Sequence, residues 1–359
     1  MLDVVVVGCG KAGENLVREL RTTSCTRVVG VCDVEPLMAS QLAIRYGISR
    51  HFSDPLQMFD SVRPSVAYIA TPPQSHHDQA ILALDHGCHV YIEKPLAPSH
   101  HEAEAIVRHA LLRQRKLTIG YGYYLDPIAV AMRALVANGA LGEVVHVESF
   151  LGYALDGQFG APVFADSHHW VHELPGKLVH NSIDHLLNKV TEFVRDENPL
   201  VMAHVAQRAQ HEGSAFAVPD EMRLMIAGRA VTGYVTFSAH ARPLAHSLTV
   251  YATRSTACLD FLSGTLTIKS TSSLPGALGR IATTFDQSWQ HFRAGRQNLL
   301  RFAKSKFHQM AGLRALIDAF HTSIENDSPP PIAYEEILRV SRITERVFSQ
   351  IDGRRVHTA

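Results

Sequence analysis

A glycine-rich segment near the start of the chain has the residue types and spacing of a phosphate-binding loop. Residues 8–13, with the sequence GCGKAG, follow directly after the apolar run 3–7 and precede an amphipathic stretch. In such a loop the first glycine permits a tight turn, the second lets the backbone approach a pyrophosphate, and the third lets the following helix pack on the strand. The helix start adds N–H donors and a positive dipole end. The candidate phosphate-binding residues here are Gly8, Gly10, Lys11, Ala12 and Gly13.

An acidic residue follows the second apolar run at a spacing that suits ribose recognition. Asp33 comes directly after the run 27–32 and lies 20 residues beyond Gly13. A carboxylate at that position accepts hydrogen bonds from the adenosine ribose hydroxyls and repels a 2′-phosphate. Residues 34–36 contain no Lys or Arg that would bind such a phosphate. We therefore expect the cofactor to be NAD, with NADP disfavoured.

Two more polar turns follow apolar runs, and one of them carries a lysine. Residues 71–76 (TPPQSH) come after the run 66–70, and residues 93–95 (EKP) come after the run 88–92. The carboxyl ends of parallel strands are where open α/β sheets bind their ligands. A cation at Lys94 would favour alkoxide character in a hydroxyl that loses hydride, and would stabilise developing charge on a carbonyl in the reverse direction. The plainer alternative is a surface lysine paired with Glu93.

The chain of 359 residues is long enough for two domains. In residues 1–122, strand-length apolar runs alternate with helical patterns, which predicts a doubly wound parallel sheet of the Rossmann type. In residues 123–359 strands follow one another with few helices between them, which predicts an α+β domain with a large, mostly antiparallel open sheet. Carboxyl-terminal helices of this second part are candidates to pack back on the first domain. The first-domain strands are expected at 3–7, 27–32, 66–70, 88–92 and 117–121, and its helices at 12–22, 36–46, 76–86 and 99–114.

The elements of the second part are less regular. Strands are expected at 143–151, 200–209, 221–227, 230–239, 246–253, 257–262 and 265–269, and helices at 128–138, 179–194, 311–325 and 334–350. Residues 152–176 form a loop rich in aromatic residues and histidines. Residues 270–310 are ambiguous, with a helical pattern around Trp289, Phe292 and Leu300.

Composition excludes several function classes. Lys plus Arg and Asp plus Glu are balanced at 34 each, so there is no basic field for nucleic acid or an anionic membrane. The five cysteines lack the spacing of metal ligands, which fits a reducing compartment. The first strand begins at once, without a signal peptide, and no apolar run has the length of a membrane span. We expect a cytoplasmic protein.

The order of the glycine loop, the TPPQSH turn and the EKP motif resembles the glucose-fructose oxidoreductase/inositol dehydrogenase (Gfo/Idh/MocA) family. The resemblance extends over essentially the whole chain, since residues 139–144 (GALGEV) and the tail at 329–347 also look similar. It implies an NAD-dependent oxidoreductase that transfers hydride between nicotinamide and a secondary hydroxyl or keto group of a sugar, cyclitol or sugar nucleotide. It also implies that Lys94 contacts the nicotinamide ribose and the reacting hydroxyl. By the same resemblance, the further cofactor contacts are Thr71, Pro72, Pro73, His76 and Glu93.

The family's second catalytic element is a D-x-x-x-H-like pair on a helix, and this sequence departs from it. One register pairs Asn181 with His185, whereas another pairs His180 with Asp184 in reversed order. We prefer the first, because an apolar pair, Leu-Leu, follows His185 as in the family. His185 would then be the general base in oxidation and the general acid in reduction. An amide at Asn181 could orient substrate or imidazole but could not stabilise imidazolium as a carboxylate does, so proton transfer would be weaker or shared with Asp184.

Aromatic residues supply candidate substrate contacts. Tyr123 and Tyr124 precede an Asp-Pro pair where many relatives have an N-x-R-like pattern, so they either select substrate or pack at the domain junction. Trp170 lies in the aromatic loop and could stack on the apolar face of a sugar ring. The spacing of His168 and His172 also suits a metal, but no cysteine joins them and the chain is rich in histidine throughout. We expect no metal.

The sequence leaves two alternative functions open, and the family resemblance predicts a homo-oligomer. Some relatives of this fold hydrolyse glycosides through transient oxidation by tightly held NAD, and a non-catalytic NAD-sensing regulator would explain Asn181. By the resemblance, the second domain's sheet, including residues 231–237, packs on a second copy to give a homodimer or a tetramer of such dimers. In the competing arrangement, helices near 285–305 cover that sheet and leave a monomer.

Overall fold

The structure is a computed structural model that describes residues 1–359 except 24, 158, 209–217, 304–309, 353–356 and 359. The chain folds into two compact units. The first unit contains residues 1–122 and 313–342, and the second contains residues 123–312 and 343–359. The boundary at 342 falls inside helix α11 (Tyr334–Asp352), so this one helix contributes residues to both units.

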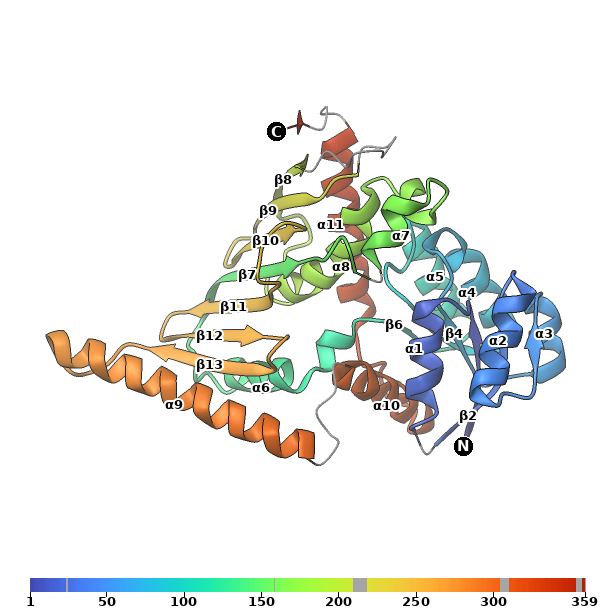
Figure 1. Ribbon diagram of the computed structural model, residues 1–359, viewed down its shortest axis with the longest axis horizontal. Helices are drawn as coiled ribbons and strands as arrows, with labels where there is room; N and C mark the ends of the chain where they lie inside the picture. Colours follow the sequence, from blue (N-terminus) through green and yellow to red (C-terminus); the bar gives the residue numbers. More distant parts are fainter. Residues whose placement is uncertain (24, 158, 209–217, 304–309, 353–356, 359) are drawn as a thin grey trace. The chain divides into compact units, whose positions relative to one another are not determined.

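The first unit is built on a six-stranded parallel sheet with the order β3-β2-β1-β4-β5-β6 (Figure 1). Its strands are β1 (Leu2–Val7), β2 (Thr26–Cys32), β3 (His51–Phe52), β4 (Val66–Ile69), β5 (His89–Ile92) and β6 (Leu117–Ile119). Val4, Val5 and Val6 of β1 are wholly inaccessible, because helices cover both faces of the sheet. The doubly wound parallel sheet predicted from the sequence is confirmed. Strand β3 is new, and its two residues are too few to give a pattern.

The connecting helices follow the predicted order. They are α1 (Lys11–Leu20), α2 (Pro36–Tyr46), α3 (Pro55–Val62), α4 (His76–Asp85) and α5 (His100–Leu112), with a 3-10 turn η1 (Pro73–Ser75) before α4. Helix α3 was not predicted, because eight residues barely show a helical period. Its N-cap residue is Asp54, whose carboxylate accepts the Leu56 N–H. Residues 313–325 of helix α10 (Ala311–Glu325) belong to this unit too, and the His321 Nε2 lies 2.6 Å from the Tyr68 hydroxyl in the core.

The second unit is built on an eight-stranded sheet with the order β13-β12-β11-β7-β10-β9-β8-β14. Its strands are β7 (Val144–Gly152), β8 (Leu200–Gln207), β9 (Glu221–Ala227), β10 (Thr232–Ser238), β11 (His246–Ala252), β12 (Ser255–Asp260), β13 (Thr265–Ser270) and β14 (His357–Thr358). The pairs β7–β10 and β8–β14 are parallel and the others antiparallel, which confirms a mostly antiparallel sheet.

One face of this sheet is covered by helix α8 (Lys177–Thr191), which packs on β7 and β10. The approach is so close that a Cβ at Gly233 would lie 2.3 Å from Val190 Cγ1. The opposite face carries aromatic and polar side chains, including His146 and Tyr234, whose ring centroids are 4.7 Å apart. The remaining helical elements are η2 (Gly122–Leu125), α6 (Pro127–Ala137), α7 (Gly160–Ala165), η3 (Trp170–Glu173) and α9 (Gly276–Ala303).

Helix α9 fills most of the segment that the sequence left ambiguous. It lies alongside the edge strand β13 instead of covering the sheet face (Figure 1). The Gln290 side chain bonds both backbone groups of Ile268, accepting its N–H at 2.7 Å and donating to its carbonyl at 2.9 Å. Within the described residues, no helix is both long enough and apolar enough to cross a bilayer.

Candidate functional site

The glycine loop lies where the order of the parallel sheet reverses, between the neighbouring strands β1 and β4. Gly8 has φ of 96°, and a Cβ there would lie 2.5 Å from the Ala70 carbonyl oxygen, so no larger residue fits. A Cβ at Gly13 would lie 1.9 Å from the Gly8 carbonyl oxygen, which is why helix and strand can pack only with glycine there. Gly10 differs, because a Cβ there would meet nothing within 4 Å. This open side is the space that a pyrophosphate requires at the start of α1.

Asp33 lies beside the glycine loop. Its carboxylate accepts the Cys9 backbone N–H at 2.6 Å and the Glu35 N–H at 2.9 Å. These two bonds hold the carboxylate at the end of β2, in the position at which dinucleotide folds bind the ribose hydroxyls. Lys11 is exposed on the first turn of α1, where it pairs with Glu14 at 3.6 Å. The loop, the helix start and the acid therefore have the form of a dinucleotide site.

His76 ties together the two polar turns that follow β4 and β5. Its Nδ1 lies 2.9 Å from the Pro95 carbonyl oxygen and its Nε2 lies 2.9 Å from the Thr71 carbonyl oxygen. The ring is wholly buried, and burial lowers its pKa. Thr71 is held as well, since its Oγ1 accepts the Ser75 hydroxyl at 2.8 Å. Pro72 precedes the η1 turn and Pro73 begins it. The hydrogen bonds of His76 thus connect the TPPQSH turn to the EKP turn.

The EKP turn carries a partly exposed lysine directly after the carboxyl group of Glu93. Burial raises the pKa of Glu93, while Lys94 opposes that shift. The Tyr91 hydroxyl donates to Glu93 at 3.3 Å. The Lys94–Pro95 peptide is cis. Lys94 thus lies at the carboxyl end of β5, in the same row of strand ends as the glycine loop.

In the second unit, helix α8 carries both of the acid–base pairs considered from the sequence. Asn181 and His185 are partly exposed, whereas His180 and Asp184 are only 2% and 3% exposed. The His180 ring stacks flat on the Phe348 ring at a centroid distance of 4.4 Å, so His180 packs as a buried core residue. The geometry therefore favours Asn181 and His185 as the pair that a ligand can reach.

A buried lysine that sequence reasoning missed follows one turn after His185. Lys189 Nζ lies 3.0 Å from His246 Nε2 and donates to the His185 carbonyl. It also lies 4.9 Å from the ring centroid of Tyr123 and 5.1 Å from that of Phe261. Burial lowers the pKa of Lys189 to about 7, against an opposing effect of Asp126. The signal in the sequence was a charge after the apolar pair 186–187, four residues beyond His185 and so on the same helix face.

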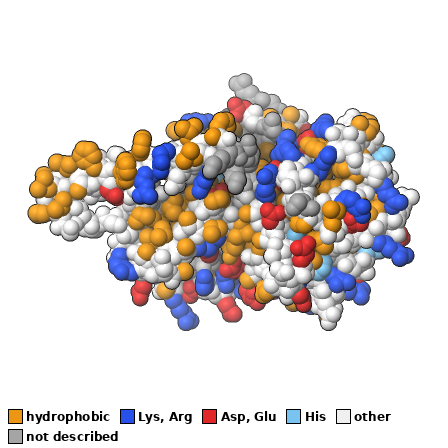
Figure 2. Space-filling model, turned by 90° about the horizontal axis from the view of Figure 1, so that it is seen from below, with side chains coloured by type: hydrophobic (Ala, Val, Ile, Leu, Met, Phe, Trp, Pro, Cys, Tyr) orange, Lys and Arg blue, Asp and Glu red, His pale blue; other side chains and the backbone are white. Residues whose placement is uncertain are grey.

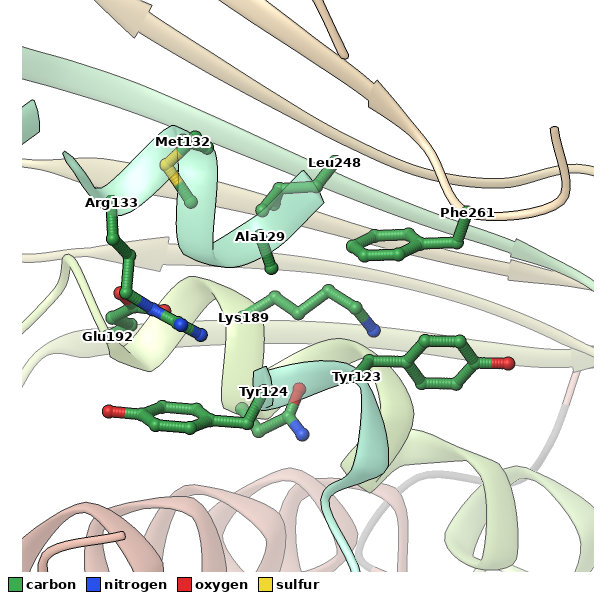
Figure 3. Close-up of a pocket in the computed structure, with 10 residues that line it drawn as sticks. Tyr123, Tyr124, Ala129, Met132, Arg133, Lys189, Glu192, Leu248 and Phe261 are labelled. Carbon is green, nitrogen blue, oxygen red and sulfur yellow. The ribbon is translucent and has the colours of Figure 1, made fainter. Parts of the chain in front are cut away.

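Around this lysine is a small aromatic pocket (Figure 3). Tyr123 meets His246 edge to face at 4.3 Å and His185 at 6.0 Å, so it links the two imidazoles. Tyr124 is stacked under the guanidinium of Arg133 at 4.0 Å. The lining residues are Tyr123, Tyr124, Ala129, Met132, Arg133, Asn188, Lys189, Glu192, Leu248 and Phe261.

The histidine-rich loop shows other roles for its side chains. Trp170 packs against the His169 ring at 5.3 Å. The His172 Nε2 lies 2.7 Å from the Val163 carbonyl oxygen, and the His168 side chain is 94% exposed. Over the described ranges, no three His, Cys, Asp or Glu side chains come together in a group that could hold a metal ion.

Comparisons with known proteins agree with this architecture. Residues 2–121 match the family model GFO_IDH_MocA, described as an oxidoreductase family with an NAD-binding Rossmann fold. The chain is 30% identical over 147 residues to D-glucoside 3-dehydrogenase of Escherichia coli, which covers 40% of this chain and 41% of that protein. It is 27% identical over 150 residues to inositol 2-dehydrogenase 2 of Saccharopolyspora erythraea, covering 41% and 44%. The matched part is thus less than half the length of these relatives.

Solved structures resemble the chain over almost its whole length. An NAD-binding oxidoreductase from Klebsiella pneumoniae gives a TM-score of 0.78 at 18% identity, with both chains fully covered. The WlbA dehydrogenase from Bordetella pertussis, crystallised with NADH and UDP-GlcNAcA, gives 0.77 at 17% identity and covers 97% of this chain and 96% of its own. At such identities the likeness establishes the fold, and the family match establishes residues 2–121 as an NAD-binding Rossmann domain.

Proposed function

We propose that this chain, which belongs through its Rossmann domain to the Gfo/Idh/MocA oxidoreductases, is an NAD-dependent dehydrogenase that acts on a secondary hydroxyl group. The observation that carries the proposal is the row of strand ends in the first unit. Along this row β2, β1, β4 and β5 end in Asp33, the glycine loop, the TPPQSH turn and the EKP turn. In this row a dinucleotide site and the lysine of the EKP turn lie at the same edge of the sheet, which suits hydride transfer.

The chain's own residues have distinct tasks in this proposal. Bound NAD would accept or return the hydride. The Lys94 ammonium would polarise the oxygen of the reacting carbon, because a fixed positive charge stabilises alkoxide character better than water does. His185 would take the hydroxyl proton in oxidation and return it in reduction. Asn181 would orient the substrate or the imidazole through its amide. Position 181 carries an amide where the family pattern has a carboxylate.

We infer that the substrate is a polyhydroxylated ring, as a sugar, cyclitol or sugar nucleotide is. Partly exposed Trp170 and Tyr123 offer aromatic faces for the apolar side of such a ring. The names of the relatives support the same class, since they are D-glucoside, inositol and UDP-N-acetylglucosamine dehydrogenases.

The test is to incubate the purified protein with NAD and a panel of glucosides, inositols and UDP-sugars, and to follow NADH absorbance. We expect NADH to form with at least one member of the panel. Hydrolysis without added NAD would indicate redox-type glycoside cleavage instead. Tight NAD binding with no turnover on any member would favour the non-catalytic regulator.

Asp33 should set the preference for NAD. We expect Asp33→Ser to weaken NAD binding about 10- to 100-fold, because hydrogen bonds to a charged group are worth about 1.5–3 kcal/mol. The same change should improve binding of NADP, since the carboxylate no longer repels a 2′-phosphate. Calorimetric titration with both cofactors measures both effects. Glu104→Ser, which removes an exposed carboxylate on α5, is the matched control and should leave the ratio of the two dissociation constants unchanged. If the wild-type protein bound NADP more tightly, the assignment would be wrong.

A further inference from the structure

Helix α9 packs on its own domain through small and polar residues. The side chains that are at least partly buried from 279 to 298 are Gly279, Ala282, Thr283, Gln287, Gln290, Ala294 and Asn298. Besides the two bonds of Gln290 to Ile268, Asn298 Nδ2 donates to the Ser263 carbonyl at 2.7 Å. The helix is therefore fastened to the sheet edge by hydrogen bonds, and the burial of large apolar side chains plays little part.

The large apolar residues of α9 point the other way. Leu278, Ile281, Phe285, Trp289, Phe292, Leu299 and Phe302, here named the α9 stripe, are each 53–72% exposed. Figure 2 shows hydrophobic side chains gathered at the left end of the view, where α9 lies. Leu278, Phe285, Phe292 and Leu299 recur every seven residues, which is the spacing of a helix seam that packs against another helix. An exposed apolar stripe of this kind marks an interaction surface.

We propose that the α9 stripe binds the α9 stripe of a second copy of this chain, with the two helices antiparallel about a two-fold axis. In such an interface the same patch is used on both copies, so it must be complementary to itself. The stripe meets that requirement in one register. When Phe285 lies opposite Gly295 of the second copy, Phe292 lies opposite Ser288. These two rings then each face a small residue, which is how helices interdigitate without voids, while Trp289 falls opposite His291.

The same register also matches the ends and the charges. Leu278 falls opposite Phe302 of the second copy, and Ile281 falls opposite Leu299. On the flank of the stripe, Asp286 comes next to Arg293 of the second copy. Residues 276–303 contain four arginines and a single acid, and this pairing brings that acid to an arginine. A parallel in-register pair would instead bring Asp286 nearest to Asp286 and each arginine nearest to its own copy, so like charges would meet.

A lipid surface is the competing occupant, because an arginine-rich helix with an aromatic face also suits anionic membranes. Arg296 argues against it. This residue follows Phe292 by four positions and precedes Leu299 by three, so it lies on the stripe itself. A charge there opposes burial in hydrocarbon. In the antiparallel pair it falls opposite Thr284 of the second copy, whose hydroxyl can accept a hydrogen bond from the guanidinium.

The first test is the molar mass of the full chain by light scattering after size exclusion. We expect Phe285→Glu combined with Phe292→Glu to halve the mass, whether the wild type is a dimer or a tetramer. The matched control is Leu111→Glu combined with Leu112→Glu on α5, which are 61% and 73% exposed and should leave the mass unchanged. An unchanged mass in the α9 variant would overturn the proposal. This result does not depend on the proposed enzymatic function.

The second test fixes the direction of the helices. In a background with Cys25→Ser and Cys258→Ser, which removes the two cysteines that are not buried, Leu278→Cys and Phe302→Cys are oxidised separately and as a mixture. We expect covalent dimers from the mixture and little from either alone. Efficient dimers from either variant alone would indicate parallel helices. Sedimentation of a monomeric wild type with anionic phospholipid vesicles, lost in the Phe285→Glu, Phe292→Glu variant, would assign the stripe to a membrane surface and would also overturn the proposal.

Discussion

Lys94→Ala is expected to lower the turnover number by about a hundredfold or more while the protein stays folded. Removing one preorganised group that stabilises developing charge typically costs a factor of that size in rate. Lys94 is partly exposed at the end of β5, so its loss leaves no cavity in the core. The pKa of Glu93, which burial already raises, should rise further in this variant, because the Lys94 charge that opposes the rise is gone. The measurement is the initial rate of NADH formation with the substrate that the panel identifies.

Three controls separate a chemical effect from a structural one. Lys269→Ala removes an exposed lysine on β13 and should leave the rate unchanged. The thermal midpoint of Lys94→Ala should stay within a few degrees of the wild-type value. Lys94→Arg keeps the charge but changes its geometry, so it should recover only part of the rate. Turnover of Lys94→Ala near the wild-type value would remove Lys94 from the mechanism.

The parts of the fold that the sequence predicted are those in which the pattern is local. The apolar run at 3–7 and the glycines after it predicted β1 and the turn into α1, because tight backbone geometry permits only glycine at Gly8 and Gly13. The packing of helix α9 escaped prediction for the opposite reason. Its buried side is polar and small while its apolar side is exposed, so the pattern did not indicate which side faces the domain. Only the hydrogen bonds of Gln290 and Asn298 decide that.

The candidate site divides in the same way. Asp33 was predictable because its distance along the chain from the glycine loop is set by one strand-helix-strand unit. The cluster around Lys189 was not, since His246 is 57 residues away in the sequence and Phe261 lies further still. No spacing rule connects residues that meet only when a helix packs on a sheet. A charge on the same helix face as His185, after the apolar pair 186–187, was the available hint.

Lys189→Met is expected to stabilise the protein and to remove a pH dependence of its stability. The folded protein releases the Lys189 proton at about pH 7, whereas an unfolded lysine keeps it to about pH 10.5. Between these values the unfolded state binds more protons at this residue, so the contribution of Lys189 to the free energy of unfolding of the wild type rises with pH across this window. Below pH 7 both states are protonated and the full cost of the buried charge remains. A shift of this size corresponds to about 5 kcal/mol.

The surroundings of Lys189 determine where else stability depends on pH. Burial and the Lys189 charge lower the pKa of His246, so this imidazole resists protonation in the folded state. It therefore contributes to the pH dependence of stability only below about pH 6.5. Burial raises the pKa values of Tyr123 and Asp126, which leaves the phenol protonated throughout the range from 7 to 10. Between pH 7 and 10, the change in the stability difference between wild type and Lys189→Met is therefore assigned to Lys189.

Urea unfolding of wild type and Lys189→Met at pH 6, 8 and 9.5 tests this assignment. Methionine has nearly the volume of the lysine stem and no charge to desolvate, so the variant should be more stable at pH 6 by several kcal/mol and the difference should shrink as the pH rises. Lys269→Met, which changes an exposed lysine in the same unit, should follow the wild-type curve at every pH. If Lys189→Met also ran parallel to the wild type at all three pH values, the lysine would keep its ordinary pKa in the fold. The amine of Lys189 would then be charged at neutral pH, and the side of α8 that carries His185 would face a full positive charge.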